Sequence, residues 1–334
     1  MKRNKMKKGL FSLAVFAVCA LMLVACGGKG ATTGGEKKVY KVGIVQLVEH
    51  EALDSANKGF VDGLAEAGFK EGENVIFDRQ NAQGDQANLK NIADRFVNED
   101  SDLILAIATP AVQTVAATTK DIPILGTAVT DYVAAKLVAS NEKPGGNVSG
   151  TTDMNPVKEQ LDLLLKIVPD VKNLGVIYTS SEVNSEIQVQ ILKDYAKTKN
   201  ITVVEVTISN VNDIQQAAQN LMGKVDAVYV PTDNMVASAM PTLTQITTAN
   251  KIPVLCGEAN QVKSGGLITV GIDYYKLGVQ TGKMAAKVLS GEAEVGNMPI
   301  EAQTEFAVVV NETAADALGI KIPADVLKGA EIIK

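Results

Sequence analysis

The sequence predicts an α/β fold of two similar lobes, each a parallel sheet flanked by helices, joined by a hinge that the chain crosses more than once. Three observations predict this fold class. Short β-branched runs alternate with helical segments from Val39 onward, the alternation occurs in two successive rounds, and a Pro-Gly-Gly stretch separates the rounds. Strands that alternate with helices form parallel sheets covered on both faces. Two rounds therefore indicate two lobes.

The first round of alternation forms the predicted N-terminal lobe, residues 39–150. Its strand candidates are rich in Val, Ile and Leu, and they comprise residues 39–48, 74–80, 103–109 and 122–129. The segments between them carry apolar residues at helical spacing, and they comprise residues 53–68, 85–98 and 110–119. Gly68 and Gly126 lie where a helix or a strand is expected to stop.

The second round forms the predicted C-terminal lobe, residues 151–273. Its strand candidates are residues 174–179, 202–208, 227–230, 253–256 and 267–271, and its helix candidates are residues 156–167, 183–199, 211–222 and 235–250. The join between the rounds is the stretch NEKPGGNVSGTTD, residues 141–153, in which Pro144, Gly145 and Gly146 interrupt all periodicity.

A third segment follows the second round. It contains an amphipathic helix at residues 274–290, a strand at residues 305–310 and a short helix at residues 314–319. We expect residues 274–291 to complete the N-terminal lobe and residues 300–334 to complete the C-terminal lobe. Repeated crossings make a hinge that permits closure about a cleft. Periodicity alone does not locate those crossings.

The first 38 residues have the layout of an export signal and a tether. Five basic residues within residues 2–8 precede an almost wholly apolar run, residues 9–25, which is short for a membrane span. The sequence Leu-Val-Ala-Cys at residues 23–26 resembles the bacterial lipobox, in which the cysteine receives diacylglycerol and becomes the new N-terminus. We expect residues 1–25 to be a lipoprotein signal peptide, Cys26 the lipidation site and residues 26–38 a flexible tether. The alternative is a plain signal peptide with an incidental cysteine.

Charge and cysteine content narrow the function classes. Residues 1–25 hold five of the 32 Lys and Arg and none of the 38 Asp and Glu, so their removal leaves 27 against 38, a net charge of −11. An acidic body repels nucleic acid and anionic headgroups, so membrane attachment would come from the lipid. Cys256 is the one cysteine left beyond Cys26. It cannot form an internal disulfide, and we expect a buried small hydrophobe rather than a nucleophile.

Several stretches resemble the solute-binding proteins of ABC importers. They are the lipobox and VGIVQLVEHEALD (42–54), LILAIATPAVQ (103–113), GTAVTDYVAAKLV (126–138), PGGNVSGTTD (144–153), YVPTDNMVAS (229–238) and GGLITVGIDYYKLGVQTG (265–282). More narrowly, the chain resembles the tryptophan- and aromatic-amino-acid-binding lipoproteins, over residues 39–334. The resemblance implies the two-lobed type I periplasmic-binding fold. It also implies an extracytoplasmic protein, lipid-anchored to the cell membrane, that delivers a ligand to ABC permease and ATPase subunits. We expect a monomer.

Candidate ligand-binding residues follow from the rule that ligands bind beyond the carboxyl ends of parallel strands. In the first lobe these positions are Gln46, Glu49, His50, Thr109, Thr127, Thr130 and Asp131. In the second lobe they are Ser180, Glu182, Asn184, Asp233, Asn234, Glu258 and Asp273. Carboxylates, hydroxyls and amides dominate this set, and it is nearly free of cations.

The shortage of cations points to a zwitterionic ligand. Beyond residue 25 the only arginines are Arg79 and Arg95, so the fork-shaped donors that favour phosphate or dicarboxylates are scarce. A ligand carboxylate would need hydroxyls and backbone amides, which Thr109 and residues 127–130 could supply. A ligand ammonium would find Asp233, Glu182 or Glu258. An amino acid fits both requirements.

Structural roles compete with each of these assignments. Thr109 and Asp233 could simply cap their helices, Asp131 and Asp273 could serve as hinge or capping residues, and Glu182 could be a solvated loop carboxylate. His50 is the only histidine, and no partnered nucleophile accompanies it. We expect a polar residue at the rim of the lobe that touches ligand rather than a catalytic group.

No catalytic residues, cofactor or metal site are expected. No nucleophile elbow, phosphate-binding loop or dinucleotide fingerprint follows a strand, and no Cys/His spacing suits a metal. We therefore predict a receptor for an amino acid, with aromatic side chains (tryptophan, phenylalanine or tyrosine) implied mainly by the resemblance. The alternatives are a receptor for a sugar, nucleoside or short peptide, a lipid-anchored enzyme using Glu49 and His50, and a ligand sensor for a membrane kinase.

Overall fold

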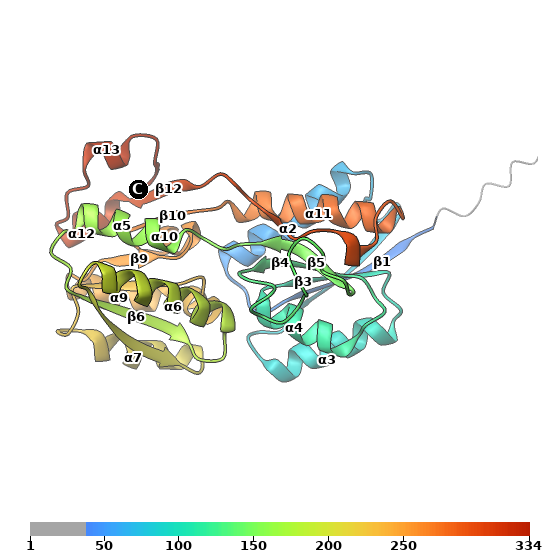
Figure 1. The fold of residues 1–334 in the computed structure, drawn as a ribbon, viewed down its shortest axis with the longest axis horizontal. Coiled ribbons are helices and arrows are strands. Elements are labelled where there is room, and N and C mark those ends of the chain that lie inside the picture. Colours follow the sequence, from blue (N-terminus) through green and yellow to red (C-terminus); the bar gives the residue numbers. More distant parts are fainter. Residues whose placement is uncertain (1–37) are drawn as a thin grey trace, which may run out of the picture. The chain divides into compact units, whose positions relative to one another are not determined.

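A computed structural model describes residues 38–334, and the predicted signal peptide and Cys26 lie outside these residues. Residues 39–334 form one folded unit that contains a six-stranded and a seven-stranded sheet (Figure 1). Both sheets are flanked by helices, which confirms the predicted fold class. Within residues 38–334, no helix combines the length and apolar character needed to cross a membrane.

The first sheet has the strand order β11-β5-β4-β3-β1-β2, and all of its pairings are parallel. Its strands are β1 (Tyr40–Gln46), β2 (Val75–Asn81), β3 (Leu103–Ile107), β4 (Ile124–Val129), β5 (Val148–Thr152) and β11 (Glu301–Ala302). Its helices are α2 (Glu51–Glu66), α3 (Gln86–Asn98), α4 (Thr109–Thr118) and α11 (Tyr274–Leu289). Helices α2 and α11 lie side by side on one face, and α3 and α4 cover the other (Figure 1). Strands β3 and β4 are buried throughout, as a doubly covered sheet requires.

Glycines allow α2 and α11 to pack backbone against backbone. A Cβ on Gly278 would stand 2.0 Å from the carbonyl oxygen of Ala56, and one on Gly63 would stand 2.4 Å from that of Val279. Gly59 and Gly282 are equally close to the facing helix. Because α11 belongs to the segment after the second round, this contact ties the distant C-terminal part of the chain to the first lobe.

The second sheet has the order β13-β12-β10-β9-β8-β6-β7. Its strands are β6 (Asn173–Thr179), β7 (Thr202–Ile208), β8 (Ala227–Val230), β9 (Val254–Cys256), β10 (Ile268–Gly271), β12 (Ala307–Asn311) and β13 (Glu331–Ile333). Its pairings are parallel except that of β12, which runs antiparallel to β10. The lobe is therefore mixed at one edge, a detail that the alternating pattern did not indicate.

Two hydrophobic clusters cover the two faces of the second sheet. One cluster lies under α5 (Val157–Ile167), α6 (Val183–Thr198), α12 (Glu312–Leu318) and α13 (Ala324–Leu327). The other lies under α7 (Ile214–Leu221), α8 (Asn234–Ser238), α9 (Met240–Ala249) and α10 (Ala259–Lys263). Short 3₁₀ turns, η1 (Val211–Asp213) and η2 (Val295–Asn297), complete the elements. Cys256 is buried in the second cluster, as expected.

The chain passes between the sheets three times, at residues 153–156, 272–273 and 303–306. Side chains link these crossings. Asn155 Oδ1 accepts a hydrogen bond from the Ile272 amide (3.1 Å), and Gln303 Nε2 donates one to the carbonyl of Asp273 (2.7 Å). The crossings therefore form one connected hinge.

The structure corrects three details of the element predictions. The stretch 141–153 is not a plain join, because it contains β5 of the first sheet. Residues 301–302 were assigned to the second lobe, but they pair with β5 in the first sheet. The helix predicted over residues 235–250 is two helices, α8 and α9, interrupted at Ala239 just before Pro241. Proline favours the first turn of a new helix over the interior of a continuous one.

Candidate functional site: the cleft between the lobes

The carboxyl ends of strands from both sheets meet around a small buried cavity of about 10 Å³, roughly the room that one water molecule needs. It is lined by His50, Ala52, Leu53, Ala128, Asp153, Thr232, Asp233, Asn234, Ala237, Glu258, Gln261 and Tyr274. These residues come from both lobes and from the hinge. No Lys or Arg is among the described residues that line it.

A second cavity of about 160 Å³ opens beside the first. The two share His50, Ala237, Glu258 and Gln261, and the larger one adds Glu49 and residues at the ends of α8 and α10. The smaller space on its own does not hold a free amino acid. We call the two cavities together the cleft.

Three contacts join the lobes across the cleft. His50 Nε2 lies 3.4 Å from Asn234 Oδ1, and the hydroxyls of Thr130 and Thr232 are 3.4 Å apart. A Cβ on Gly84 would stand 2.5 Å from Met235 Cε, so the Met235 side chain rests against the backbone of the first lobe. These contacts all depend on the lobes lying close together.

Asp233 is held by the second lobe itself. The Thr179 amide and the Ser185 hydroxyl donate to its Oδ2 (2.6 and 2.7 Å), while the Thr179 hydroxyl and the Val236 amide donate to its Oδ1 (2.8 and 2.9 Å). A carboxylate offers about four acceptor positions. All four are filled, so Asp233 serves chiefly to cap α8 and to tie it to β6 and α6.

Glu182 plays a similar structural role. Its carboxylate accepts hydrogen bonds from the Asn184 side chain (2.9 Å), from the amide and side chain of Asn234, and from the Met235 amide (3.2 Å). Burial and the nearby Asp233 raise the pKa of Glu182 to about 8. The residue is buried rather than solvated, which excludes the alternative of a loop carboxylate in water.

Two other buried carboxyls face the cleft with acceptor capacity to spare. Glu258 caps α10 by accepting from the amides of Asn260 and Gln261 (2.6 and 2.7 Å). Burial raises the pKa of Glu258 to about 7. Asp153, on the first crossing, accepts from the hydroxyls of Thr130 (3.0 Å) and Tyr274 (2.7 Å), and burial raises its pKa.

His50 is uncharged in this setting. Burial lowers the pKa of His50 to about 4, despite the opposing effects of the Asn234 contact and of Asp54. Its near neighbour across the cleft is an amide and not a nucleophile. The imidazole therefore acts as a neutral hydrogen-bonding group between the lobes.

Two buried polar atoms have no hydrogen-bond partner among the described residues, Thr109 Oγ1 and Asn184 Oδ1. Thr109 begins α4 and Asn184 lies in the first turn of α6, and these helices approach each other from opposite lobes. Buried polar groups are normally satisfied. The nearby backbone is also strained, since Ala108 and Ala128, at the ends of β3 and β4, have φ values of 85° and 56°.

The structure brings together only part of the predicted site. Glu49, His50, Asp233, Asn234 and Glu258 line the cleft. Thr130, Glu182 and Asn184 hold residues that line it, whereas Thr109 begins α4 after the end of β3 and lines neither cavity.

The remaining predicted residues point elsewhere. Thr127 bonds Thr151 inside the first lobe, Gln46 bonds Asp54 at the start of α2, and Asp131 accepts from the amides of its own turn. Ser180 is exposed, and Asp273 caps α11 on the outer side of the hinge. For these residues the capping and packing alternatives describe the observed contacts.

The predicted set of ligand-binding residues does not include Asp153, Thr232, Gln261 and Tyr274, which all line the cleft. Asp153 ends the predicted join over residues 141–153, because the sequence pattern does not predict β5. The signal available was the run Gly150-Thr-Thr-Asp153, in which polar residues follow a possible strand end. Tyr274 directly follows the candidate Asp273, at the start of the predicted helix over residues 274–290.

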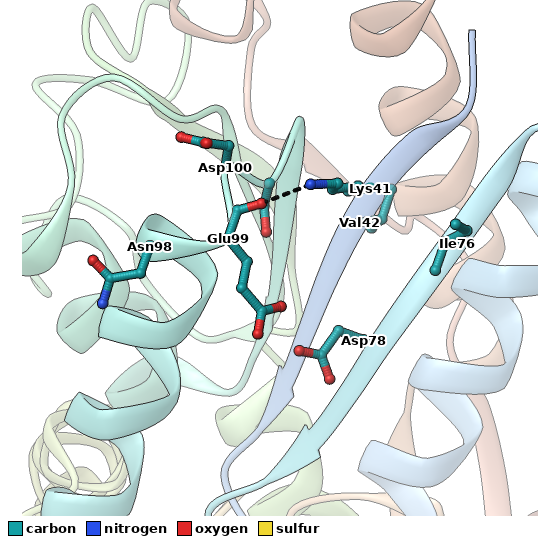
Figure 2. Close-up of a pocket in the computed structure, with 8 residues that line it drawn as sticks. Lys41, Val42, Ile76, Asp78, Asn98, Glu99 and Asp100 are labelled. Carbon is teal, nitrogen blue, oxygen red and sulfur yellow. Dashed lines mark hydrogen bonds between the residues drawn. The ribbon is translucent and has the colours of Figure 1, made fainter.

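A larger cavity of about 400 Å³ lies at the opposite edge of the first sheet (Figure 2). It is lined by residues near the starts of β1 and β2 and by the turn after α3, where Lys41 Nζ donates to the carbonyl of Glu99 (3.0 Å). Ligands of parallel α/β sheets bind at the carboxyl ends of strands. This cavity is at the wrong end, and it touches one lobe only.

Two hinged α/β lobes around a polar cleft define a solute receptor of the periplasmic-binding type. A family model described as "ABC transporter substrate binding protein" matches residues 41–334, and the chain belongs to this family. Proteins of this family act outside the cytoplasm and bind solutes for ABC importers. The predicted class of function is thereby confirmed.

Individual relatives are similar over nearly the whole chain. A tyrosine-binding protein of Clostridioides difficile is 45% identical over 330 residues, which cover 96% of this chain and 95% of the relative. A second relative is an ABC domain from Streptococcus pneumoniae, whose crystal structure is in complex with L-Trp. Its sequence is 40% identical to this chain, the match covers 89% of this chain and 100% of the relative, and the two structures superpose with a TM-score of 0.86.

A third relative allows the arrangement of the lobes to be compared. The ligand-free, open form of a substrate-binding protein with adhesive properties from Clostridium difficile is 48% identical over 89% of this chain and 99% of its own. Its TM-score is only 0.68, although its sequence is more similar than that of the L-Trp complex. The lobes here are therefore arranged more like those of the liganded relative, in agreement with the contacts across the cleft.

Proposed function

We propose that this protein captures an aromatic amino acid between its two lobes and delivers it to an ABC permease. The observation that carries the proposal is the cleft itself, where buried carboxyls line a space that has no Lys or Arg among its described residues. Such a site favours a ligand that brings a positive charge. Relatives named for tyrosine binding and crystallised with L-Trp support an amino acid with an aromatic side chain.

Closure would be a population shift. A ligand that touches both lobes stabilises the closed state, in which His50 and Asn234 meet. The stabilisation equals the difference between the free energies with which the ligand binds the closed and the open forms. The joined surfaces of the closed lobes would then be presented to the permease.

The ligand carboxylate has a candidate subsite at Thr109. Its hydroxyl is buried and has no described partner, and it begins a ten-residue helix whose N-terminus favours negative charge. A carboxylate at this position would satisfy the hydroxyl without a basic side chain. Replacing Thr109 with Val keeps the shape and removes the donor. It should weaken amino-acid binding by about tenfold, in line with the worth of a hydrogen bond to a charged group.

Isothermal titration calorimetry with the twenty amino acids tests the function. We expect binding of tyrosine, tryptophan or phenylalanine, and none of comparable affinity for the acidic amino acids. A protein that binds only sugars, nucleosides or peptides would exclude the proposal. Titrating the same ligand-free protein with sugars, nucleosides and short peptides separates these receptor classes.

Attachment to the membrane through lipid on Cys26 is a separate part of the proposal. It is supported by the basic segment, the apolar run and the Leu-Val-Ala-Cys sequence. We expect Cys26→Ser to release the protein from the membrane fraction without altering amino-acid binding. Equal membrane retention of the variant would show that the cysteine carries no anchor.

A further inference from the structure

Asp153 occupies an unusual place for a buried carboxylate, on the first hinge crossing and facing the cleft. It is 3% exposed, and the hydroxyls of Thr130 and Tyr274 hold its two oxygens from the first lobe and from the second crossing. Two of its roughly four acceptor positions are thus in use. The side chain is fixed in direction and still able to accept further donors from within the cleft.

Among the other carboxylates that line the smaller cavity, Asp233 and Glu258, one remains as a partner for Asp153. Asp233 already accepts four hydrogen bonds, and Glu182 does not line the cleft. Glu258 lines both cavities, and its described donors are two backbone amides. Asp153 and Glu258 both line the smaller cavity, together with Tyr274.

We propose that Asp153, positioned by Tyr274 and Thr130, and Glu258 form the ammonium subsite of the cleft. This assignment rests on the proposed function, and it moves the ammonium away from Asp233 and Glu182. A primary ammonium carries three donors. The free acceptor positions of the two carboxylates can accept hydrogen bonds from these donors. The positive charge of the ammonium would also pair with carboxylates that have no Lys or Arg beside them in the described lining.

The position of Asp153 has a consequence for selectivity. Because the carboxylate is buried and no Lys or Arg lines the cavity, a ligand without an amine leaves both acids without a cation. Desolvated groups of this kind discriminate strongly against ligands that cannot pair with them. The amine should therefore contribute more to affinity than the ligand carboxylate does.

The test is calorimetric titration of the wild-type protein and three variants with L-tyrosine, tyramine and 3-(4-hydroxyphenyl)propionate. The variants are Asp153→Asn, Glu258→Gln and, as a matched control, Asp226→Asn. Asp226 is also held by two hydrogen bonds, from the amides of Lys172 and Asn173, but it precedes β8, at the amino end of that strand and away from the carboxyl ends that face the cleft. Thermal melts confirm that each variant folds.

For the wild-type protein we expect tyramine to bind more tightly than the propionate. Asp153→Asn and Glu258→Gln should each weaken L-tyrosine and tyramine about 10- to 100-fold and leave the propionate unchanged or tighter. Asp226→Asn should match the wild type with all three ligands. A fourth variant, Tyr274→Phe, should lower the ratio of amine to propionate affinity, because Asp153 loses the hydroxyl that positions it. A merely structural role of Tyr274 would weaken both ligands together.

Other outcomes separate the two proposals. If the wild-type protein binds the propionate as tightly as L-tyrosine, or if Asp153→Asn binds both amines normally, the ammonium subsite is wrong while aromatic capture stands. If the protein binds a non-aromatic amine and no aromatic amino acid, the proposal of aromatic capture fails. The ammonium subsite is then tested by titrating the same variants with that amine and with its deaminated analogue. A wild-type protein that binds no amine overturns both.

Discussion

His50 of the first lobe and Asn234 of the second lie 3.4 Å apart, and this contact closes the cleft above the buried carboxyls. His50 follows β1 and Asn234 begins α8, so one residue from each lobe meets at the strand ends. The pair shows how the fold positions function. Parallel sheets end their strands at one edge, and a hinge brings two such edges together.

Glu258 and His50 should contribute to the pH dependence of stability with opposite signs. The pKa of Glu258 is raised to about 7 in the folded protein, so that state binds more protons than the unfolded chain and loses stability as pH rises from about 4.5 to 7. The pKa of His50 is lowered to about 4, so its contribution has the opposite sign and grows as pH rises from about 4 to 6.5.

Variants at these two positions should therefore diverge. Relative to the wild type, Glu258→Gln should gain stability with rising pH, by about 3 kcal/mol at most, while His50→Gln should lose it. Urea unfolding of the ligand-free proteins at pH 4.5, 6 and 8 measures both trends. Parallel curves for the two variants would contradict the assigned pKa shifts.

The close packing of α2 on α11 predicts a sharp penalty for a single methyl group. Gly278→Ala places a Cβ against the Ala56 carbonyl, so the helices must move apart, and we expect a loss of about 2 kcal/mol or more. Lys287→Ala, on the exposed side of α11, is the control and should change the stability little. Chemical denaturation measures the free energy of unfolding of both variants and of the wild type. Equal stabilities would mean that the glycines are dispensable.

Backbone strain at the end of β3 predicts the reverse effect of a glycine. Ala108 has a φ of 85°, which glycine adopts without a steric penalty, so Ala108→Gly should preserve or raise the melting temperature. Ala106, within β3, is the matched control, and Ala106→Gly should lower it by the cost of glycine in a strand. A larger loss at residue 108 than at residue 106 would show that no strain is stored there.

Asp233 should prove to be a structural residue. Asp233→Ala leaves the amides of Thr179 and Val236 and the Ser185 hydroxyl without their acceptor, and we expect a loss of about 3 kcal/mol of unfolding free energy. Asp226→Ala, in an exposed position, should cost much less. If Asp233→Ala folds with normal stability and only ligand binding fails, the capping role assigned here is wrong.

The fold was largely predictable because its signals are local. Apolar runs such as Leu103–Ile107 and the helical spacing after Asp85 lie within single elements, and the alternation of strands and helices fixes the sheet type. Strand β5 was not predicted, because it contains Gly150 and three residues with hydroxyl groups where a buried strand usually has a run of β-branched apolar residues. The antiparallel pairing of β12 with β10 was not predicted, because it depends on the third crossing, residues 303–306, and no local sequence pattern indicates that crossing.

The site was less predictable because it depends on distant contacts. Asp233 and Glu258 lie at strand ends as expected, but only the structure separates a saturated carboxylate from one with free acceptor positions. The bond between Tyr274 and Asp153 joins residues 121 positions apart. Pairing of this kind follows from the hinge crossings, which periodicity could not locate.

A crystal structure of the protein grown with L-tyrosine or L-tryptophan tests the central claim most directly. The account predicts the amino acid between the lobes, with its ammonium between Asp153 and Glu258 and its carboxylate near Thr109. A ligand seated in one lobe alone, or in the cavity beside Lys41 with the cleft empty, would contradict it.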